Sequence, residues 1–292
     1  MNVFVTGATG YIGSAVVEAL RAAGHSVTGL ARSAEAEQRL TGSGIRAARG
    51  DLASMTGLIA AASFADGIIH AGTTNDGTLD TAAITAMLGA LKGTGKPFVY
   101  TSGVWVLGNT GVRVADESAP ANPIALDAWR PGVEQLTLAS APHNVRAIVI
   151  RPGVVYGCGR GISADFVRFA RENGAARYVG DGTNRWPMIH VDDLARLYLL
   201  ALERGPSGAL YHAGDDTAYR VKEIAEAAST GAGAGGRTES WPLEDARQQL
   251  GSYADALVLD QRISSERAKR ELGWSACAAS VLDDLRSGSH VA

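Results

Sequence analysis

Three glycines near the start of the chain have the spacing of a turn that binds a pyrophosphate. The stretch "VFVTGATGYIGSAVVEAL" places them after a β-branched run and at the start of an amphipathic segment. The first glycine allows a tight bend, the second lets backbone amides approach the phosphates, and the third permits close helix–strand packing. The helix N-terminus adds unpaired N–H groups and partial positive charge. The residues expected beside a dinucleotide here are Gly7, Thr9, Gly10, Tyr11, Ile12 and Gly13.

The end of the second predicted strand, "SVTGLARS", selects between the two nicotinamide cofactors. An acidic residue there would bind the ribose 2′-hydroxyl of NAD, but the chain has Arg32 and Ser33. Arg32 can pair bidentately with a 2′-phosphate, and Ser33 can donate a hydrogen bond to it. The alternative is that Arg32 is only a solvated surface charge. The sequence therefore favours NADP(H), with NAD(H) as the alternative. In "GDL", Asp51 can face the adenine amino group and Leu52 its ring.

These residues need a parallel sheet to position them, and the chain predicts one. Six short β-branched runs read as buried strands, at 2–7, 26–31, 44–50, 67–72, 96–103 and 145–153. Segments 11–24 and 81–95 between them have helical apolar spacing and end in glycine. Alternation of this kind indicates a doubly wound α/β fold. After Tyr156 the pattern loosens, with a helix at 189–205, a strand at 208–214 and a helix at 221–229. The Gly-rich stretch 230–240 is expected to be a mobile loop.

Composition excludes several classes of protein. With 292 residues and 46% hydrophobic composition, the chain can bury a substantial core. The net charge of −3 gives no general attraction to nucleic acid or to anionic membrane. Every apolar run is shorter than about 18 residues, which argues against a spanning helix. Cys158 and Cys277 lie far apart without metal spacing, so we expect reduced thiols and no metal. These features predict a soluble cytoplasmic protein.

Seven segments together resemble one superfamily over essentially the whole chain. They are "TGATGYIG", "GDL", "HAG", "VYTSGVWVLG", "RPGVVYG", "GDGTNRWPMIHVDDLARLYLLALE" and "RAKRELGW". Their order and spacing are similar to those of the extended short-chain dehydrogenase/reductases, the epimerase/dehydratase superfamily. The resemblance implies a Rossmann domain over 1–155, with 189–215 packing back onto it. It implies a smaller substrate-binding lobe formed by 156–188 and 216–292.

The chain departs from this family at the residues that move protons. The family uses a Ser or Thr after the fifth strand, and a Tyr followed four residues later by Lys. Alignment on "VEQ" puts Leu126 at the tyrosine position and Arg130 at the lysine position. Alignment on "VWVLG" puts Gly103, rather than Ser102, at the position of the Ser or Thr. Arg130 could still donate to the ribose hydroxyls, although its pKa excludes acid–base work. The alternative for Arg130 is a surface salt bridge. Ser102 and Arg130 are therefore the candidate catalytic residues.

Pro131 affects where the following helix can start. Inside a helix it would cost roughly 3 kcal/mol, but the first turn tolerates it. We therefore expect the helix to begin near Arg130 and Leu126 to lie in a loop. Asp127, beside it, looks like an exposed carboxylate.

The resemblance also assigns residues further along the chain. It implies that the backbone of "RPGVV" meets the nicotinamide carboxamide, and that the segment after the fourth strand passes the phosphates and ribose. The cofactor residues implied in this way are Gly72, Thr73, Arg130, Pro152, Gly153 and Val154. The expected substrate contacts are Ser102, Tyr156, Arg185 and Trp186.

The leading interpretation is an atypical NADP(H)-dependent reductase of this family without the Tyr–Lys pair. Hydride addition to an activated alkene, quinone or iminium needs less help at oxygen than ketone reduction does. One alternative is a redox-inactive dinucleotide sensor or scaffold, and another is a nucleotide-sugar epimerase or dehydratase. The resemblance further implies a homodimer formed through the helix at 78–93 and the one after Arg130.

Overall fold

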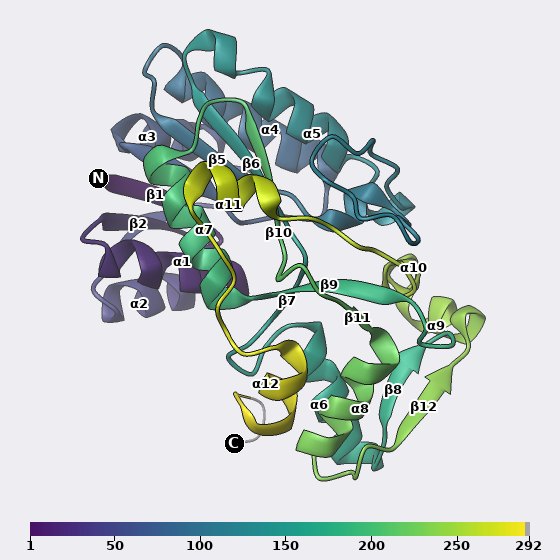
Figure 1. Cartoon of the computed structure of the whole chain (residues 1–292). Helices are drawn as coiled ribbons and strands as arrows, with labels where there is room; N and C mark the ends of the chain where they lie inside the picture. Colours follow the sequence, from purple (N-terminus) through teal and green to yellow (C-terminus); the bar gives the residue numbers. More distant parts are fainter. Residues whose placement is uncertain (290–292) are drawn as a thin grey trace.

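The computed structural model describes residues 1–289, and a seven-stranded parallel sheet forms its centre (Figure 1). All seven strands expected for this sheet are present. They are β1 (Asn2–Thr6), β2 (Ser26–Ala31), β3 (Arg46–Arg49), β4 (Gly67–His70), β5 (Pro97–Thr101), β6 (Arg146–Pro152) and β10 (Ala209–Ala213). Their order is β10-β6-β5-β4-β1-β2-β3, so the direction of winding reverses between β1 and β4. Such a reversal opens a crevice at the carboxyl ends of the strands, where ligands bind in this kind of sheet.

Helices cover both faces of the sheet. One face is packed by α1 (Tyr11–Ala22), α2 (Ala34–Gly42), α7 (Val191–Arg204) and α11 (Glu266–Leu272). The other is packed by α3 (Met55–Phe64), α4 (Gly77–Leu91) and α5 (Arg130–Leu138). Each layer has its own core of buried Val, Ile, Leu and Ala side chains, as the all-apolar strands predict. The doubly wound α/β fold is confirmed.

A smaller lobe adjoins the carboxyl ends of the strands (Figure 1). It contains a sheet of β7 (Val154–Tyr156), β9 (Arg185–His190) and β11 (Ala218–Arg220), and a pair formed by β8 (Ala176–Val179) and β12 (Thr238–Trp241). Its helices are α6 (Ile162–Asn173), α8 (Val221–Gly231), α9 (Leu243–Leu250), α10 (Tyr253–Leu257) and α12 (Val281–Ser287). A third hydrophobic core joins α6, α8 and α12 to these strands. The lobe therefore has a core of its own beside the sheet.

Two details differ from what the sequence pattern indicates. The Gly-rich stretch 230–240 ends in β12, which pairs with β8 and so ties this segment to the lobe. Segment 266–274, expected in the lobe, packs on the central sheet, since Ala268, Leu272 and Trp274 belong to the core beside α1 and α7. The Trp274 Nε1–H donates to the carbonyl of Asp193 in α7 at 2.8 Å, which ties segment 266–274 to that helix.

Local signals set the position of α5. The helix begins at Arg130 with Pro131 in its first turn, where the missing amide hydrogen costs nothing. Ala125–Asp127 forms a short 3-10 turn before it, and this turn carries Leu126. The expectation that Leu126 lies outside the helix is confirmed. Further 3-10 turns lie at Val104–Leu107 and Ala141–His143.

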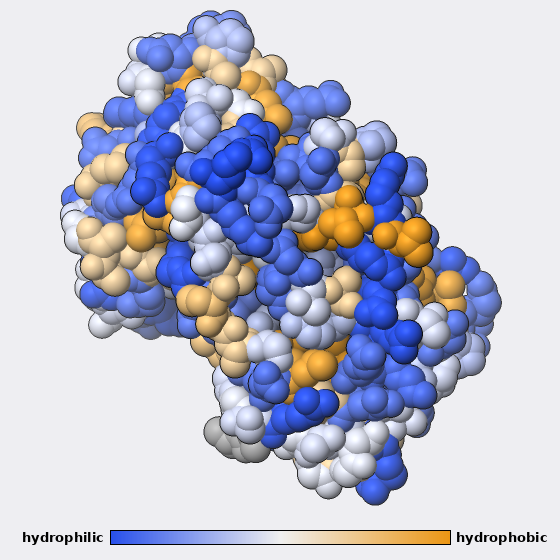
Figure 2. Space-filling model, viewed as in Figure 1, coloured by the Kyte–Doolittle hydropathy of each residue, from blue (hydrophilic) through white to orange (hydrophobic). Residues whose placement is uncertain are grey.

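On the face seen in Figure 2, hydrophilic residues dominate and hydrophobic ones form small separate groups. Within residues 1–289, no helix combines the length and apolar character needed to cross a membrane.

Candidate active site

The turn after β1 has the close approaches that only glycine allows. Gly7 has φ 69°, and a Cβ there would lie 2.5 Å from the carbonyl oxygen of Ala71. A Cβ on Gly13 would lie 2.0 Å from the carbonyl oxygen of Gly7. The Gly10 amide donates to that same carbonyl at 2.8 Å, which closes the turn directly before α1. Side chains would fill this cradle, so the turn fits a pyrophosphate held by backbone amides.

A cavity of about 520 Å³ lies beside this turn at the ends of β1, β2 and β4. The sequence-predicted cofactor residues that line it are Gly7, Thr9, Gly10, Arg32, Asp51, Leu52, Gly72 and Thr73. Arg32 is exposed, and within residues 1–289 its guanidinium makes no ion pair or hydrogen bond. Ser33 Oγ accepts from the Ala36 amide at 3.2 Å and caps α2, which leaves its O–H as a donor. The chain thus places one unpaired cation at this end of the cavity.

The loop after β4 is held by a buried carboxylate that sequence reasoning missed. Asp80, in the first turn of α4, accepts hydrogen bonds from the Thr73 hydroxyl and from the Thr74 amide (2.8 Å) and hydroxyl (2.6 Å). The next residue, Asn75, has φ 61°, in the left-handed region that asparagine tolerates. This arrangement directs Asn75 to a second cavity. The Thr-Thr-Asn-Asp run signals a turn in the sequence, but only the fold shows what it borders.

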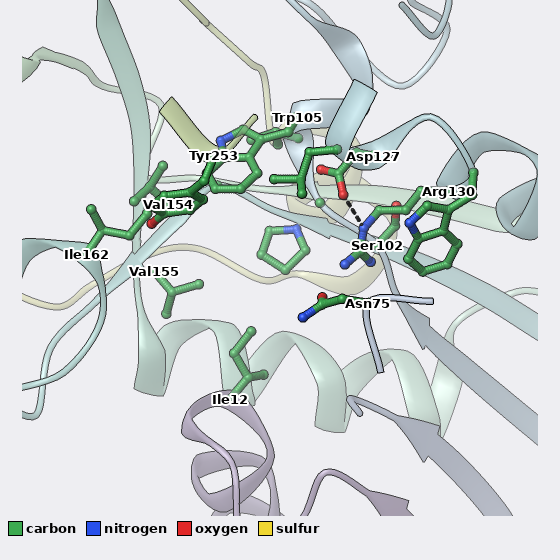
Figure 3. Close-up of a pocket in the computed structure, with 16 residues that line it drawn as sticks. Ile12, Asn75, Ser102, Trp105, Asp127, Arg130, Val154, Val155, Ile162 and Tyr253 are labelled. Carbon is green, nitrogen blue, oxygen red and sulfur yellow. Dashed lines mark hydrogen bonds and ion pairs between the residues drawn. The ribbon is translucent and has the colours of Figure 1, made fainter. Parts of the chain in front are cut away.

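The second cavity, of about 450 Å³, lies between the end of the central sheet and the lobe (Figure 3). Ile12 closes one side, Val155 and Ile162 another, and Asp127 with Arg130 the opposite one. The predicted residues that line it are Ile12, Ser102, Leu126, Arg130, Pro152, Gly153 and Val154. The residues that were not predicted are Asn75, Val104, Trp105, Trp129, Val155, Ile162 and Tyr253. Its walls are therefore mostly apolar or aromatic, with a small polar group at one side.

That polar group is centred on Arg130. Its Nε donates to Asp127 Oδ1 at 2.6 Å, and its guanidinium lies 4.7 Å from the Trp129 ring centroid. Asp127 is buried, which corrects the expectation of an exposed carboxylate: the 3-10 turn directs it inward. Burial by itself would lower the pKa of Arg130, but Tyr100 and Asp127 together raise it, so the guanidinium stays charged. Arg130 is therefore not a surface charge. Its salt bridge to Asp127 lies in the wall of the cavity.

Hydroxyl groups near the end of β5 differ in their availability. Ser102 is buried, and its Oγ has no hydrogen-bond partner within residues 1–289. The neighbouring Thr101 Oγ1 accepts from the Tyr198 hydroxyl at 2.7 Å. Tyr100, at the end of the same strand, is buried in the core, and desolvation raises the pKa of its phenol. Ser102 is thus the hydroxyl residue of this segment that lines the cavity, and its buried Oγ lacks a partner.

Leu126 does line the cavity, in the place where the family resemblance puts a tyrosine. Of the tyrosines within residues 1–289, only Tyr253 lines it, and Tyr253 comes from α10 of the lobe. It lies across the cavity from Ser102 and Arg130 (Figure 3). Burial raises the pKa of Tyr253 to about 12, and Asp165 adds to the shift. A phenol with this pKa stays protonated near pH 7.

Four predicted residues point elsewhere. The Tyr11 hydroxyl donates to the carbonyl of Gly157 at 2.7 Å, so its ring joins α1 to the lobe. Tyr156 donates to the carbonyl of Ala279 at 2.6 Å, and Arg185 donates to the carbonyl of Ala218 at 2.6 Å. Trp186 is buried in the core of the lobe and stacks on Phe166. None of these four side chains lines the cavity of Arg130 in the described part of the chain.

A buried ion pair connects two of the elements that line the cavity. Arg151 donates from Nε to Glu134 Oε1 at 2.8 Å and from Nη2 to Glu134 Oε2 at 2.5 Å. Both side chains are about 95% buried. The pair connects α5, which carries Arg130, to the end of β6, which continues into Pro152–Val154. It therefore fixes two walls of the cavity relative to each other.

Comparison with known proteins agrees with this fold. The model of the NAD dependent epimerase/dehydratase family matches residues 3–214. An uncharacterised protein of Saccharomyces cerevisiae is 35% identical over 298 residues, which cover 98% of each chain. A 3-diazoavenalumate denitrifying reductase of Streptomyces is 27% identical over 98% of this chain and 99% of its own. The crystal structure of Thermus thermophilus UDP-glucose 4-epimerase with NAD has a TM-score of 0.80 at 21% identity, covering 98% of this chain and 99% of the other.

Proposed function

The chain belongs to the NAD-dependent epimerase/dehydratase family, and from this premise we propose that it is an NADP(H)-dependent oxidoreductase that acts on a small molecule without a Tyr–Lys pair. One observation carries the proposal. The glycine turn lies between the two cavities, since Gly7 and Gly10 line the first and Ile12 lines the second. A dinucleotide with its pyrophosphate on the turn would extend into both. Its adenosine end would meet Arg32, and its nicotinamide end would meet Ser102 and Arg130.

The unpaired guanidinium of Arg32 supports NADP(H) over NAD(H). A 2′-phosphate beside it would gain charge-assisted hydrogen bonds. Within residues 1–289, no carboxylate forms an ion pair with Arg32 that would compete with the phosphate. Ser33 Oγ accepts from the Ala36 amide, and its O–H can donate to the same phosphate. The start of α2 beside it supplies partial positive charge that favours an anion. The epimerase structure cited above contains NAD, so this preference is a property we propose for the present chain.

Bound in these cavities, the nicotinamide supplies or accepts a hydride. Arg130 binds the nicotinamide ribose through its remaining N–H groups while Asp127 orients it. Ser102 donates from its free Oγ to the oxygen of the substrate. Neither Arg130 nor Leu126 can release a proton near pH 7, so water delivers it. Substrates whose reduction needs little acid catalysis at oxygen, such as quinones and activated alkenes, suit this set of residues. Sugar epimerisation, which depends on the tyrosine in this family, does not.

The test measures binding and chemistry separately. Calorimetric titration with NADPH and NADH gives the cofactor preference, and single-turnover oxidation of bound NADPH by a quinone, an enone and a ketone gives the reaction. We expect tighter NADPH binding and faster turnover of quinone and enone than of ketone. Tight NADPH binding without oxidation by any acceptor would contradict the proposal and identify a dinucleotide sensor instead.

A further inference from the structure

A third cavity, of about 380 Å³, adjoins the cavity of Arg130 inside the lobe. The two cavities share two wall residues, Ile162 from α6 and Tyr253 from α10. The Tyr253 ring packs edge-on against Trp105 with the centroids 6.0 Å apart. Its hydroxyl has no hydrogen-bond partner within residues 1–289. The partition between the cavities thus consists of side chains held by packing alone.

The walls of this third cavity are rich in aromatic rings. They include Phe166, Phe169, Trp186 and Trp241, with aliphatic contributions from Val179 and Leu257. Phe166 and Trp186 are stacked with centroids 6.0 Å apart. Phe169 and Trp241 both pack on the Arg177 guanidinium, whose carbon lies 4.3 Å and 5.2 Å from their ring centroids. Walls of this kind bind a flat apolar group better than a hydrated one.

The charges around the two cavities are already paired. Arg130 pairs with Asp127 at 2.6 Å, Arg168 with Asp165 at 2.7 Å, and Arg177 with Glu239 at 2.5 Å. These three are the cations that line the two cavities in the described residues, and both Asp165 and Glu172 face the third cavity. A diphosphate placed here would meet carboxylates without an unpaired cation to neutralise it.

We propose that this third cavity, lined by Phe169 and Trp241, is the second half of the substrate site and binds the uncharged aromatic end of the substrate. The reacting group of the same molecule lies near Ser102. This inference rests on the proposed function, and it names the substrate class: an uncharged molecule with at least two aromatic rings, in place of a nucleotide sugar. Tyr253 and Ile162 separate its two ends, and the substrate displaces the Tyr253 ring to span both cavities.

The experiment uses ketones of two lengths, UDP, and two surface substitutions. 4-Acetylbiphenyl, acetophenone and UDP are each dialysed against the NADP⁺-loaded protein, in which ketone turnover cannot occur. We expect the two-ring ketone to bind about tenfold more tightly than the one-ring ketone, because the second ring buries apolar surface. Gln249→Trp, on the exposed rim of the third cavity, then abolishes this preference by filling the cavity. Gln248→Trp, exposed on the same helix but outside the cavity, leaves the preference unchanged.

Three results would overturn the substrate class. They are equal binding of the two ketones, a preference that survives in Gln249→Trp, and saturable binding of UDP. NADP⁺ affinity is measured separately for the parent protein and both variants. A parent protein that does not bind NADP⁺ contradicts the proposed function. A parent protein that binds NADP⁺ but does not distinguish the two ketones contradicts only the further inference.

Discussion

Arg130 Nε and Asp127 Oδ1 are 2.6 Å apart, within the wall of the cavity at the carboxyl end of the sheet. We predict that Arg130→Ala weakens NADPH binding about tenfold or more, because a charged hydrogen-bond donor to the ribose is lost. Arg130→Lys should retain part of the affinity, since the charge persists. Asp127→Asn, which keeps an acceptor for Nε, serves as the control and should change the affinity little. Unchanged affinity in both Arg130 variants would make Arg130 a structural residue only.

Arg32 is predicted to set the cofactor preference. Arg32→Ala should reduce NADPH affinity by about 1.5–3 kcal/mol, the usual worth of a hydrogen bond to a charged group, and leave NADH affinity unchanged. Calorimetric titration of both cofactors measures the ratio. Arg39→Ala, exposed on the following helix α2 and outside the cavity, is the control. The proposal fails if the NADPH-to-NADH ratio is the same in Arg32→Ala as in the parent.

Gly10 is predicted to be required for dinucleotide binding but not for folding. A Cβ at this position lies 3.0 Å from the carbonyl oxygen of Gly7, so Gly10→Val crowds the turn where the phosphates would bind. We expect loss of NADPH binding with a cooperative thermal transition preserved. Gly89→Ala has open space around its new Cβ and should leave binding unchanged while stabilising α4 by about 0.5–1 kcal/mol. Normal NADPH binding by Gly10→Val would show that the turn has another role.

Acid should destabilise the fold through two buried histidines. Desolvation lowers the pKa of His70 from 6.5 to about 4 and that of His212 from 6.5 to about 3. Both stay neutral in the fold while the unfolded chain binds their protons below pH 6.5. The free energy of unfolding should therefore fall as pH drops from 6.5 toward 4, by up to about 1.4 kcal/mol per pH unit for each histidine. Urea unfolding at pH 7, 6 and 5 measures this slope. We expect a smaller slope in His70→Gln. A slope identical to that of the parent protein would show that His70 does not contribute to the acid sensitivity.

The Arg151–Glu134 pair should be costly to break. Glu134→Ala leaves the Arg151 guanidinium buried without its carboxylate, and we expect a loss of about 3–5 kcal/mol in the free energy of unfolding. Gln135→Ala, exposed on the same helix, should change stability by less than about 0.5 kcal/mol. Denaturant titration of both variants compares them directly. Equal stability of the two would mean that the pair contributes no net energy.

Local patterns in the chain were enough to predict the strands of the central sheet, the glycine turn and the start of α5. Each depends on neighbours in sequence: apolar runs that are buried on both faces, a Gly7–Gly10–Gly13 spacing, and a proline tolerated in a first turn. The residues predicted to bind the cofactor at the ends of β1 and β2 line one cavity, because parallel strands bring their carboxyl ends to one edge.

Only the tertiary structure decided which partners the buried polar side chains have and which residues form the far wall of the cavity of Arg130. Periodicity cannot show that the 3-10 turn directs Asp127 inward to Arg130, or that Asp80 holds Thr73 and Thr74. Tyr253 lies more than a hundred residues from Arg130 in the chain and lines the same cavity, because α10 folds back against the end of the sheet. Contacts of this kind arise from the packing of distant elements, so no local pattern in the sequence contains them.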